Sequence, residues 1–303
     1  MTSSLISNPL PDASVERAAE PAAPPRRSLL RRLWSRPRGR AGVIILVFMI
    51  LLGLVSLIGI RPDGPDVQNV FHALKGPSGS HLFGTDSLGR DVFSRVQSGI
   101  VLSLEISVIA TAICTVVGTL GGVIAGYLGG VVSAAVMGVA DLLFAIPSIL
   151  LSLALVTALG QGTFDIALAI GIGYSPIFAR VVRGPVLAVR EADYVKAGSV
   201  LGLSRMRVLF RHILPAVGGV LAVQITLALG WAILTQAGIS FLVGAPPPPA
   251  ASLGQMVSDG SAIARTAWWN LAFPAGAIVL LIIGFNLVGD ALRDVLDPNS
   301  ARD

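Results

Sequence analysis

Long apolar runs recur along the chain and are the strongest pattern in the sequence. Residues 41–60 contain no charged side chain, and five further apolar runs follow. A bilayer core about 30 Å thick is crossed by about 20 apolar residues in a helix. The pattern therefore predicts an all-α membrane protein with six transmembrane helices. The six expected spans cover residues 41–60, 100–126, 131–159, 164–182, 214–243 and 271–289.

Polar segments between these runs divide the chain. Residues 1–40 are rich in Ala, Pro and Arg, and we expect a disordered cytoplasmic tail followed by a basic interfacial segment. Residues 41–298 are expected to form the transmembrane domain, and residues 299–303 a short tail. The connecting segments of this domain are expected to be outer loops at 61–98 and 244–270 and a cytoplasmic loop at 184–213.

Positive charge is distributed unevenly over these segments. An even number of spans places both termini on one side of the membrane. Seventeen of the 22 Lys and Arg residues are counted on that side, in the two tails and from Arg180, near the end of the fourth span, to the start of the fifth. Because cytoplasmic segments carry the excess of Lys and Arg, both termini are expected in the cytoplasm.

The composition agrees with a membrane protein. Hydrophobic residues make up 53% of the 303 residues, charged residues only 13%, and the mean hydropathy is +0.79. An average soluble domain has about 25% charged residues, so this chain cannot cover a soluble surface of its size. A soluble enzyme, a disordered chain and a nucleic-acid-binding domain are excluded. The net charge of +5 reflects topology first and contact with anionic membrane lipid second.

The sequence contains no recognisable catalytic or metal-binding pattern. It lacks a phosphate-binding Walker A motif, a dinucleotide glycine fingerprint and an HExxH motif. The single cysteine, Cys114, lies in an apolar run and is expected in the core, and the three histidines lie far apart in sequence. We therefore expect no catalytic residues, no metal and no cofactor in this chain. If ATP drives its function, a separate chain must hydrolyse the ATP.

Residues 190–215 are the most informative segment. Glu191 and Asp193 are expected to open a helical run, which Gly202 breaks. Ser204 can cap a second helix, and Pro215 starts the next span. Two short amphipathic helices joined at a glycine suit a docking element. A membrane-surface loop without a partner fits the same pattern.

This segment resembles the EAA loop of ABC importer permeases, in which Leu-Pro follows a glycine by twelve and thirteen residues. Gly202, Leu214 and Pro215 match that spacing, and the run YVKAG resembles a variant found in dipeptide and oligopeptide permeases. The resemblance implies that the loop couples the chain to an ATPase. The residues expected in this coupling element are Glu191, Asp193, Tyr194, Val195, Lys196, Ala197, Gly198, Gly202, Leu214 and Pro215.

Further motifs narrow the resemblance to one group. The segment HLFGTDSLGRDVFSR at 81–95 is similar to one in the C-type subunit of the dipeptide, oligopeptide and nickel permeases. GYLGG at 126–130 and FNLVGDALRDVLDP at 285–298 resemble later landmarks of that group, whereas Val243 and Leu253 depart from its outer-loop signature. In all, the resemblance extends from about residue 30 to residue 298.

The resemblance implies a type I ABC importer permease fold and a transport function. Such a subunit forms half of a pathway for di- or oligopeptides in a bacterial inner membrane. Its implied partners are a homologous B-type permease subunit, two ATP-binding subunits that hold ATP and Mg, and an extracytoplasmic substrate-binding protein. Nickel or haem uptake by the same class and a self-sufficient secondary transporter are the alternatives. A membrane enzyme would need a catalytic set that the sequence lacks.

Two groups of residues are candidates for direct roles. Glu105 and Asp141 lie within expected spans, where an acid marks either a substrate pathway or a site buried against the partner permease. The outer-loop motif is expected to form turns with internal ion pairs, or to contact the binding protein. Its candidate residues are Gly84, Thr85, Asp86, Gly89, Arg90 and Asp91.

Overall fold

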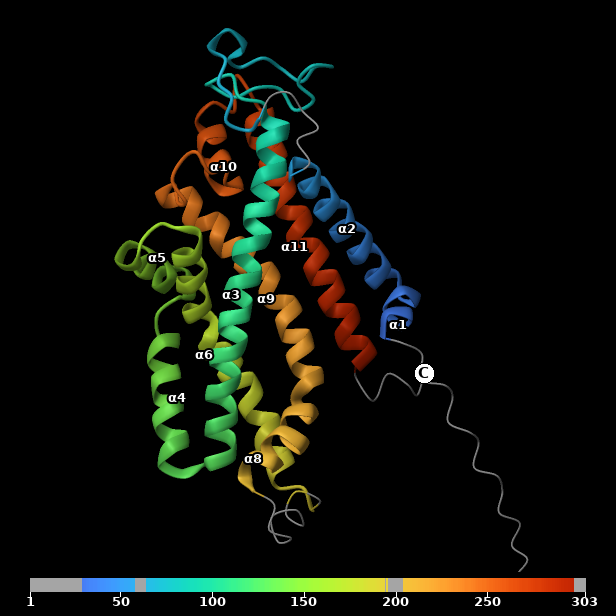
Figure 1. The fold of residues 1–303 in the computed structure, drawn as a ribbon, viewed down its shortest axis with the longest axis vertical. Coiled ribbons are helices and arrows are strands. Elements are labelled where there is room, and N and C mark those ends of the chain that lie inside the picture. Colours follow the sequence, from blue (N-terminus) through green and yellow to red (C-terminus); the bar gives the residue numbers. More distant parts are fainter. Residues whose placement is uncertain (1–28, 58–63, 194, 196–203, 297–303) are drawn as a thin grey trace, which may run out of the picture.

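The computed structural model describes residues 29–57, 64–193, 195 and 204–296, and these are almost entirely helical (Figure 1). Of the expected N-terminal segment at 1–40, residues 1–28 lie outside the described residues, as does the expected tail at 299–303. In chain order the elements are α1 (Leu29–Ser35), α2 (Pro37–Leu57), η1 (Val70–His72), α3 (Val92–Leu128), α4 (Gly130–Phe144), α5 (Ser148–Leu159), α6 (Thr163–Arg190), α8 (Arg205–Val208), η2 (Leu209–Ile213), α9 (Leu214–Val243), α10 (Leu253–Ala262) and α11 (Trp269–Leu296).

Five of these helices are long and apolar enough to cross a membrane: α2, α3, α6, α9 and α11. They contain four of the six expected spans and, in α2, the described part of a fifth, residues 41–57, and the predicted all-helical membrane fold is confirmed. Three helices, α3, α6 and α11, are clearly longer than expected. Because α3 begins at Val92, the last part of the expected outer loop is helical. Because α6 continues to Arg190, so is the first part of the expected cytoplasmic loop.

The expected span over residues 131–159 is not a single straight helix. This run forms α4 and α5, which are bent by 88° at a short break, so the bundle has five spans, or six if the pair counts as one. Pro147 stands at the break, where it has no backbone N–H to continue α4. Its carbonyl instead accepts hydrogen bonds from the N–H groups of Leu150 and Leu151 at 2.9 and 3.0 Å and so begins α5.

Small residues allow α3 and α6 to pack at close range. Gly118 and Gly122 are four residues apart on α3 and therefore face the same way. A Cβ atom added at Gly118 would lie 2.3 Å from the Cβ atom of Phe178, and one at Gly122 would lie 2.5 Å from the Ala179 carbonyl oxygen. Such contacts between small residues are the usual way in which membrane helices approach.

The described polar segments gather at the two ends of the bundle (Figure 1). Residues 64–91 and α10 lie at one end, which we name the loop end. The turn between α3 and α4 lies with α8 at the opposite end, which we name the α8 end. Between them, large apolar side chains such as Phe48 and Trp231 are more than half exposed on the isolated chain. Lipid or a partner subunit must cover such surfaces.

Candidate functional site

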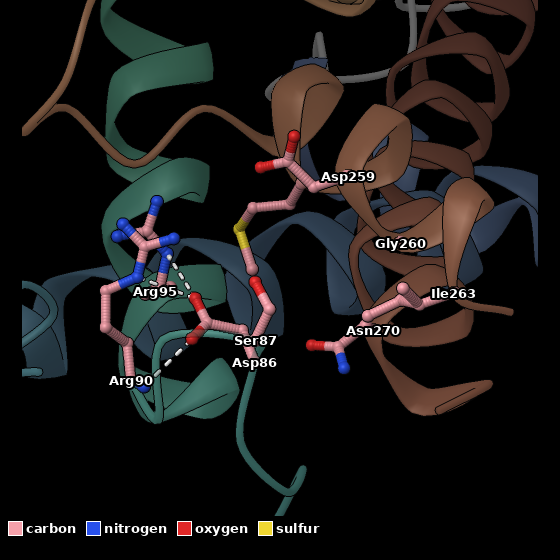
Figure 2. Close-up of a pocket in the computed structure, with 9 residues that line it drawn as sticks. Asp86, Ser87, Arg90, Arg95, Asp259, Gly260, Ile263 and Asn270 are labelled. Atoms are coloured by element: carbon pink, nitrogen blue, oxygen red, sulfur yellow. Dashed lines mark hydrogen bonds and ion pairs between the residues drawn. The ribbon is translucent and has the colours of Figure 1, made fainter. Parts of the chain in front are cut away.

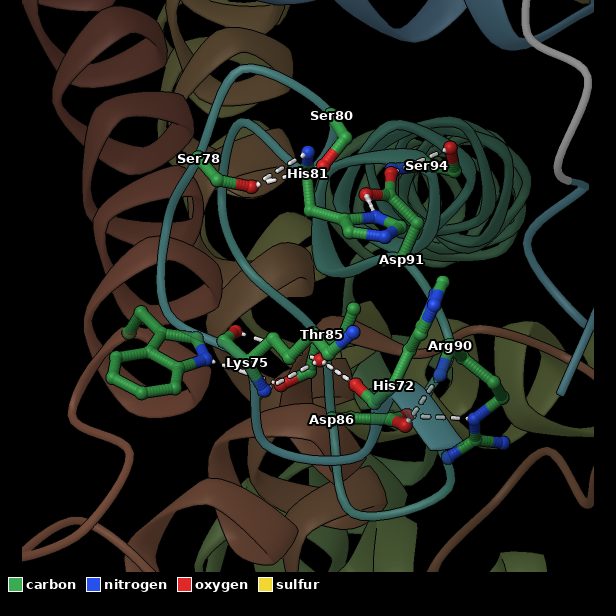
Figure 3. Close-up of polar contacts among 11 residues, drawn as sticks. His72, Lys75, Ser78, Ser80, His81, Thr85, Asp86, Arg90, Asp91 and Ser94 are labelled. Carbon is green, nitrogen blue, oxygen red and sulfur yellow. Dashed lines mark hydrogen bonds and ion pairs between the residues drawn. The ribbon is translucent and has the colours of Figure 1, made fainter. Parts of the chain in front are cut away.

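At the loop end, Thr85 joins three segments of the chain (Figure 3). Its fully buried side chain accepts a hydrogen bond from the N–H of Lys75 at 2.8 Å and donates one to the carbonyl of His72. Its own carbonyl accepts from Trp269 Nε1 at 3.1 Å and from Asn270 Nδ2 at 3.2 Å. The turn is thereby fastened to the start of α11.

The next residue, Asp86, organises the charged part of the loop. One carboxylate oxygen accepts from the N–H groups of Leu88 and Arg90, both at 2.9 Å, and the other lies 2.6 Å from Arg90 Nε. Arg95 Nε lies 3.9 Å from the same carboxylate, and Arg95 Nη1 lies 3.4 Å from Asp66. The predicted internal ion pairs are confirmed. Sequence reasoning missed Arg95, although it stands in the same motif.

Asp91 caps the N-terminus of α3. One carboxylate oxygen accepts from Ser94 N at 2.9 Å and from Ser94 Oγ at 2.8 Å, while the other lies 3.1 Å from His81 Nδ1. A carboxylate here satisfies a free N–H group and complements the helix dipole. The flanking turns contain Gly84 and Gly89 with φ of +74° and +72°, which glycine adopts without strain. The motif residues thus build a rigid loop.

A small polar hollow lies between this loop and α10 (Figure 2). It measures about 330 Å³, including space open to the outside. The pKa of Asp259 is raised above its ordinary value, chiefly by burial and also by Asp86, while Arg90 and Arg95 oppose the shift. The hollow is thus lined by two arginines, which both lie beside Asp86, and by two carboxyl groups, Asp86 and Asp259. Its lining residues are Asp86, Ser87, Arg90, Arg95, Met256, Asp259, Gly260, Ile263 and Asn270.

The two intramembrane acids have different surroundings. Glu105 is exposed on α3. Asp141 on α4 forms an ion pair with Arg180 Nη2 at 2.7 Å, and the same guanidinium lies 4.0 Å from the ring centre of Phe144. Arg180 lies within α6, as do Arg183 and Arg190, so these three charges belong to the helix and not to the segment that follows it. An exposed ion pair on these helices requires water or another protein in contact with it, because lipid would destabilise it.

A second polar group, which the sequence did not reveal, is buried between α3, α9 and the start of α10. Gln236 is fully buried, and its carbonyl oxygen accepts from Ser103 Oγ at 3.1 Å. Its amide nitrogen donates to Ser240 Oγ at 3.0 Å and Ser252 Oγ at 3.3 Å. The one sign of this group in the sequence is the amide side chain of Gln236 within the apolar run that forms α9. The group fixes three elements and leaves Gln236 satisfied, so we assign it a structural role.

The expected coupling segment is described in part. Glu191 was expected to open a helix, but it forms the C-cap of α6 and pairs with Arg190 at 3.0 Å, so that expectation is wrong. Ser204 precedes α8, and its Oγ lies 3.4 Å from the N–H of Arg207. Leu214 and Pro215 begin α9, as expected. Tyr194, Lys196, Ala197, Gly198 and Gly202 lie outside the described residues.

The remaining described residues of that segment pack against the bundle. Asp193 is exposed, whereas Val195 is buried in a cluster with Val208 and Val217. Val195 precedes the undescribed residues 196–203 and Val208 follows them. Both belong to the cluster that contains Val217, so the segment is anchored to the start of α9 on both sides. Among the described residues no group of three His, Cys, Asp or Glu side chains is close enough to hold a metal ion.

Together these features define a multi-pass helical membrane protein. Its polar side chains hold the loop end in a fixed shape and form an exposed ion pair between α4 and α6. Residues 118–302 match the family of binding-protein-dependent transport system inner membrane components, and the chain belongs to this family. It is therefore a permease subunit of an ABC transporter in the inner membrane. Such a permease has no ATPase site or cofactor of its own, and ATP is bound by a partner ATPase. The system also includes a binding protein.

Several relatives match over most of the chain, three of them as follows. The oligopeptide transport system permease protein OppC of Bacillus subtilis is 40% identical, covering 88% of this chain and 87% of the relative. The dipeptide transport system permease protein DppC of Alkalihalophilus pseudofirmus is 35% identical, covering 97% and 96%. The glutathione transport system permease protein GsiD of Shigella flexneri is 41% identical, covering 88% and 89%. The predicted resemblance to the C-type peptide permeases is confirmed.

Proposed function

We propose that this chain forms one half of the translocation pathway of an importer for di- or oligopeptides. The assignment of peptides as the substrate rests on one observation. The three relatives, 35–41% identical over nearly the whole chain, are named for oligopeptide, dipeptide and glutathione transport, and all three substrates are peptides. The other half is a homologous B-type permease subunit. Two ATP-binding subunits and an extracytoplasmic substrate-binding protein complete the transporter.

In this proposal the loop end faces the binding protein and the α8 end faces the cytoplasm, with both termini inside. The loop-end motif supports a docking role because its side chains are bonded to one another and hold a fixed shape. Ser87 and Leu88 are exposed at the tip of the turn held by Asp86. They can therefore contact the binding protein without breaking the ion pairs beneath them.

The exposed charges on α3, α4 and α6 are the proposed pathway residues. A peptide carries an ammonium group at one end and a carboxylate at the other. Glu105 can attract the ammonium group, and the Arg180 guanidinium can exchange Asp141 for the peptide carboxylate, because bidentate arginine–carboxylate pairs are strong. Water in the pathway would also remove the cost of exposing these charges between membrane helices.

The segment from Glu191 to Pro215 is the proposed coupling element. It connects α6 with α9, and its buried Val195 and Val208 tie it to the start of α9. Movement of an ATPase that holds this segment would therefore be passed to two spanning helices together. Gly202 is the proposed corner, which a side chain would obstruct.

Reconstitution in liposomes tests the proposal. Uptake of a labelled tripeptide is measured with this chain, the second permease, both ATPases and the binding protein, and again with each component omitted. We expect ATP-dependent uptake only from the full set. Uptake driven by an ion gradient through this chain alone would identify a secondary transporter, and uptake of nickel or haem but never peptide would reject the substrate.

A pair of variants tests the coupling element within the same system. Gly202→Val is expected to lower both transport and substrate-stimulated ATP hydrolysis at least tenfold while the chain still inserts and assembles. Gly218→Val is the control, because a Cβ atom added at Gly218 meets no atom within 4 Å. Normal transport by Gly202→Val would show that coupling occurs elsewhere.

A further inference from the structure

Three arginines follow one another along α6, and two of them have acidic partners. Arg180 pairs with Asp141 at 2.7 Å, and Arg190 pairs with Glu191 at 3.0 Å. Arg183 lies between them and forms no ion pair with any described residue. Its Nε atom is shielded from solvent and has no hydrogen-bond acceptor within the described part of the chain.

This situation is costly for an isolated chain. Arg183 as a whole is partly exposed, but its shielded Nε loses contact with water and gains no hydrogen bond from the described residues in return. Arg183 is seven residues from the end of α6, which is about 10 Å along the helix and still within the candidate span. An acceptor from outside the described chain would remove the penalty, and a negatively charged one would remove most of it.

A hollow beside Arg183 has room for such a group. It lies between the start of α4 and the last turns of α6 and measures about 650 Å³, including space open to the outside. Ser133 lines it with a side chain that is only 6% exposed, and its Oγ has no hydrogen-bond partner among the described residues. The complete lining is Gly129, Gly130, Ser133, Ala134, Met137, Arg183, Leu187 and Arg190.

The N-terminus of α4 adds positive potential to the same hollow. The helix spans 15 residues from Gly130, and its N-cap, Gly129, provides no side-chain hydrogen bond. The first N–H groups of a helix have no partner within it and attract anions, phosphate in particular. Three groups therefore converge on one space: a guanidinium whose Nε has no acceptor among the described residues, a hydroxyl without a partner there, and a helix N-terminus. Together they suit a tetrahedral oxyanion with several acceptor oxygens.

The surroundings indicate where the oxyanion comes from. Leu128, Val131 and Val132 flank the hollow and are 49%, 85% and 43% exposed. The hollow also lies at the α8 end, where the spanning helices α3 and α6 finish (Figure 1). The ends of spanning helices are where a surrounding bilayer places its headgroups. A free phosphate would not cover these apolar side chains, whereas a phospholipid joins a phosphate to acyl chains. Basic pockets between membrane helices are known to bind anionic headgroups.

We propose that this hollow between α4 and α6 binds the phosphate of an anionic membrane phospholipid, with Arg183 as its principal ligand. The Ser133 hydroxyl and the α4 N-terminus complete the headgroup site, and the acyl chains lie against Val131 and its neighbours. The bound lipid neutralises Arg183 and joins the start of α4 to the end of α6.

The full chain, purified in detergent, can be titrated with phosphatidylglycerol, diacylglycerol and inorganic phosphate. Lipid retention is measured by native mass spectrometry, and stability is measured as the melting midpoint. We expect phosphatidylglycerol to bind and stabilise, and diacylglycerol and inorganic phosphate to do so far less. Arg183→Gln should weaken phosphatidylglycerol binding about tenfold, and Ser133→Ala about threefold.

Two further variants make the test decisive. Arg183→Lys keeps the charge and should retain part of the binding, which separates loss of the ligand from misfolding. Arg293→Gln removes an exposed arginine from the last turn of α11 and should leave binding unchanged.

Equal binding by wild type and Arg183→Gln would overturn the proposal, as would inorganic phosphate binding as tightly as the lipid. So would failed assembly of Arg183→Gln with unchanged lipid binding, because the anion would then belong to a partner subunit. None of these lipid measurements depends on which substrate the transporter carries.

Discussion

Single residues at the loop end are fixed by contacts on several sides. Thr85 bonds through its side chain to the preceding turn and through its carbonyl to the start of α11. Asp91 caps α3 and also contacts His81. Residues with several partners cannot be replaced without leaving some partner unsatisfied, which costs more than the bond itself contributes.

Gly89 should tolerate no side chain. Its φ is +72°, and an added Cβ atom would lie 1.8 Å from the Asn69 carbonyl oxygen. Gly89→Ala is expected to destabilise the chain by at least about 2 kcal/mol, which a lower melting midpoint in detergent would report. Gly79→Ala is the control, since a Cβ atom there meets nothing within 4 Å. Equal melting of the two variants would contradict the observed turn.

The raised pKa of Asp259 gives stability a pH dependence of known sign. A carboxyl that holds its proton more tightly in the folded protein stabilises the fold while protonated. That contribution is lost as pH rises from the unfolded pKa, about 3.9, through the folded value. Asp259→Asn should therefore melt higher relative to wild type at pH 7 than at about pH 4. A difference that is constant with pH would show that Asp259 does not titrate in this way.

Pairs of helices depend on small residues and on breaks in the chain. Gly118 and Gly122 allow α3 and α6 to pack in close contact, and Pro147 separates α4 from α5. These positions determine the distances and angles between helices. The apolar residues around them determine only that helices form.

The seam between α3 and α6 can be tested with adjacent glycines. Gly122→Ala would place a Cβ atom 2.5 Å from the Ala179 carbonyl oxygen, whereas the nearest atom to a Cβ at Gly121 is 3.7 Å away. Gly122→Ala is expected to cost about 1–3 kcal/mol through overpacking, and Gly121→Ala close to nothing. Melting midpoints of the two purified proteins provide the comparison. Equal stability would mean that α3 and α6 do not meet at this seam.

At the scale of the whole molecule, the placement of polar segments at two ends gives a direct test of orientation. Ser78 is exposed at the loop end and Ser204 is exposed near α8. In a Cys114→Ala background, a cysteine at 78 is expected to react with an impermeant thiol reagent in intact cells. A cysteine at 204 is expected to react only after the membrane is permeabilised. Labelling at 204 but not at 78 would reverse the proposed orientation.

The helical class and most of the spans were predictable because they depend on local chemistry. A run of about 20 apolar residues can satisfy its backbone in a bilayer only as a helix or in a barrel, and these runs lack the alternation of a barrel strand. The ion pairs of the loop-end motif were predictable because Asp86 and Arg90 are four residues apart in a turn. The permease family followed from motifs that the sequence itself displays.

Only the tertiary structure decided how distant residues meet. Asp141 and Arg180 are 39 residues apart, and the Trp269 donor is 184 residues from the Thr85 carbonyl, so no local pattern pairs them. The 88° bend between α4 and α5 likewise depends on what packs beside them, because a proline in a membrane helix can also be accommodated by a kink. Arg183 was visible in the sequence as one charge among many. Its lack of a counter-ion among the described residues emerged only once α4 and α6 lay side by side.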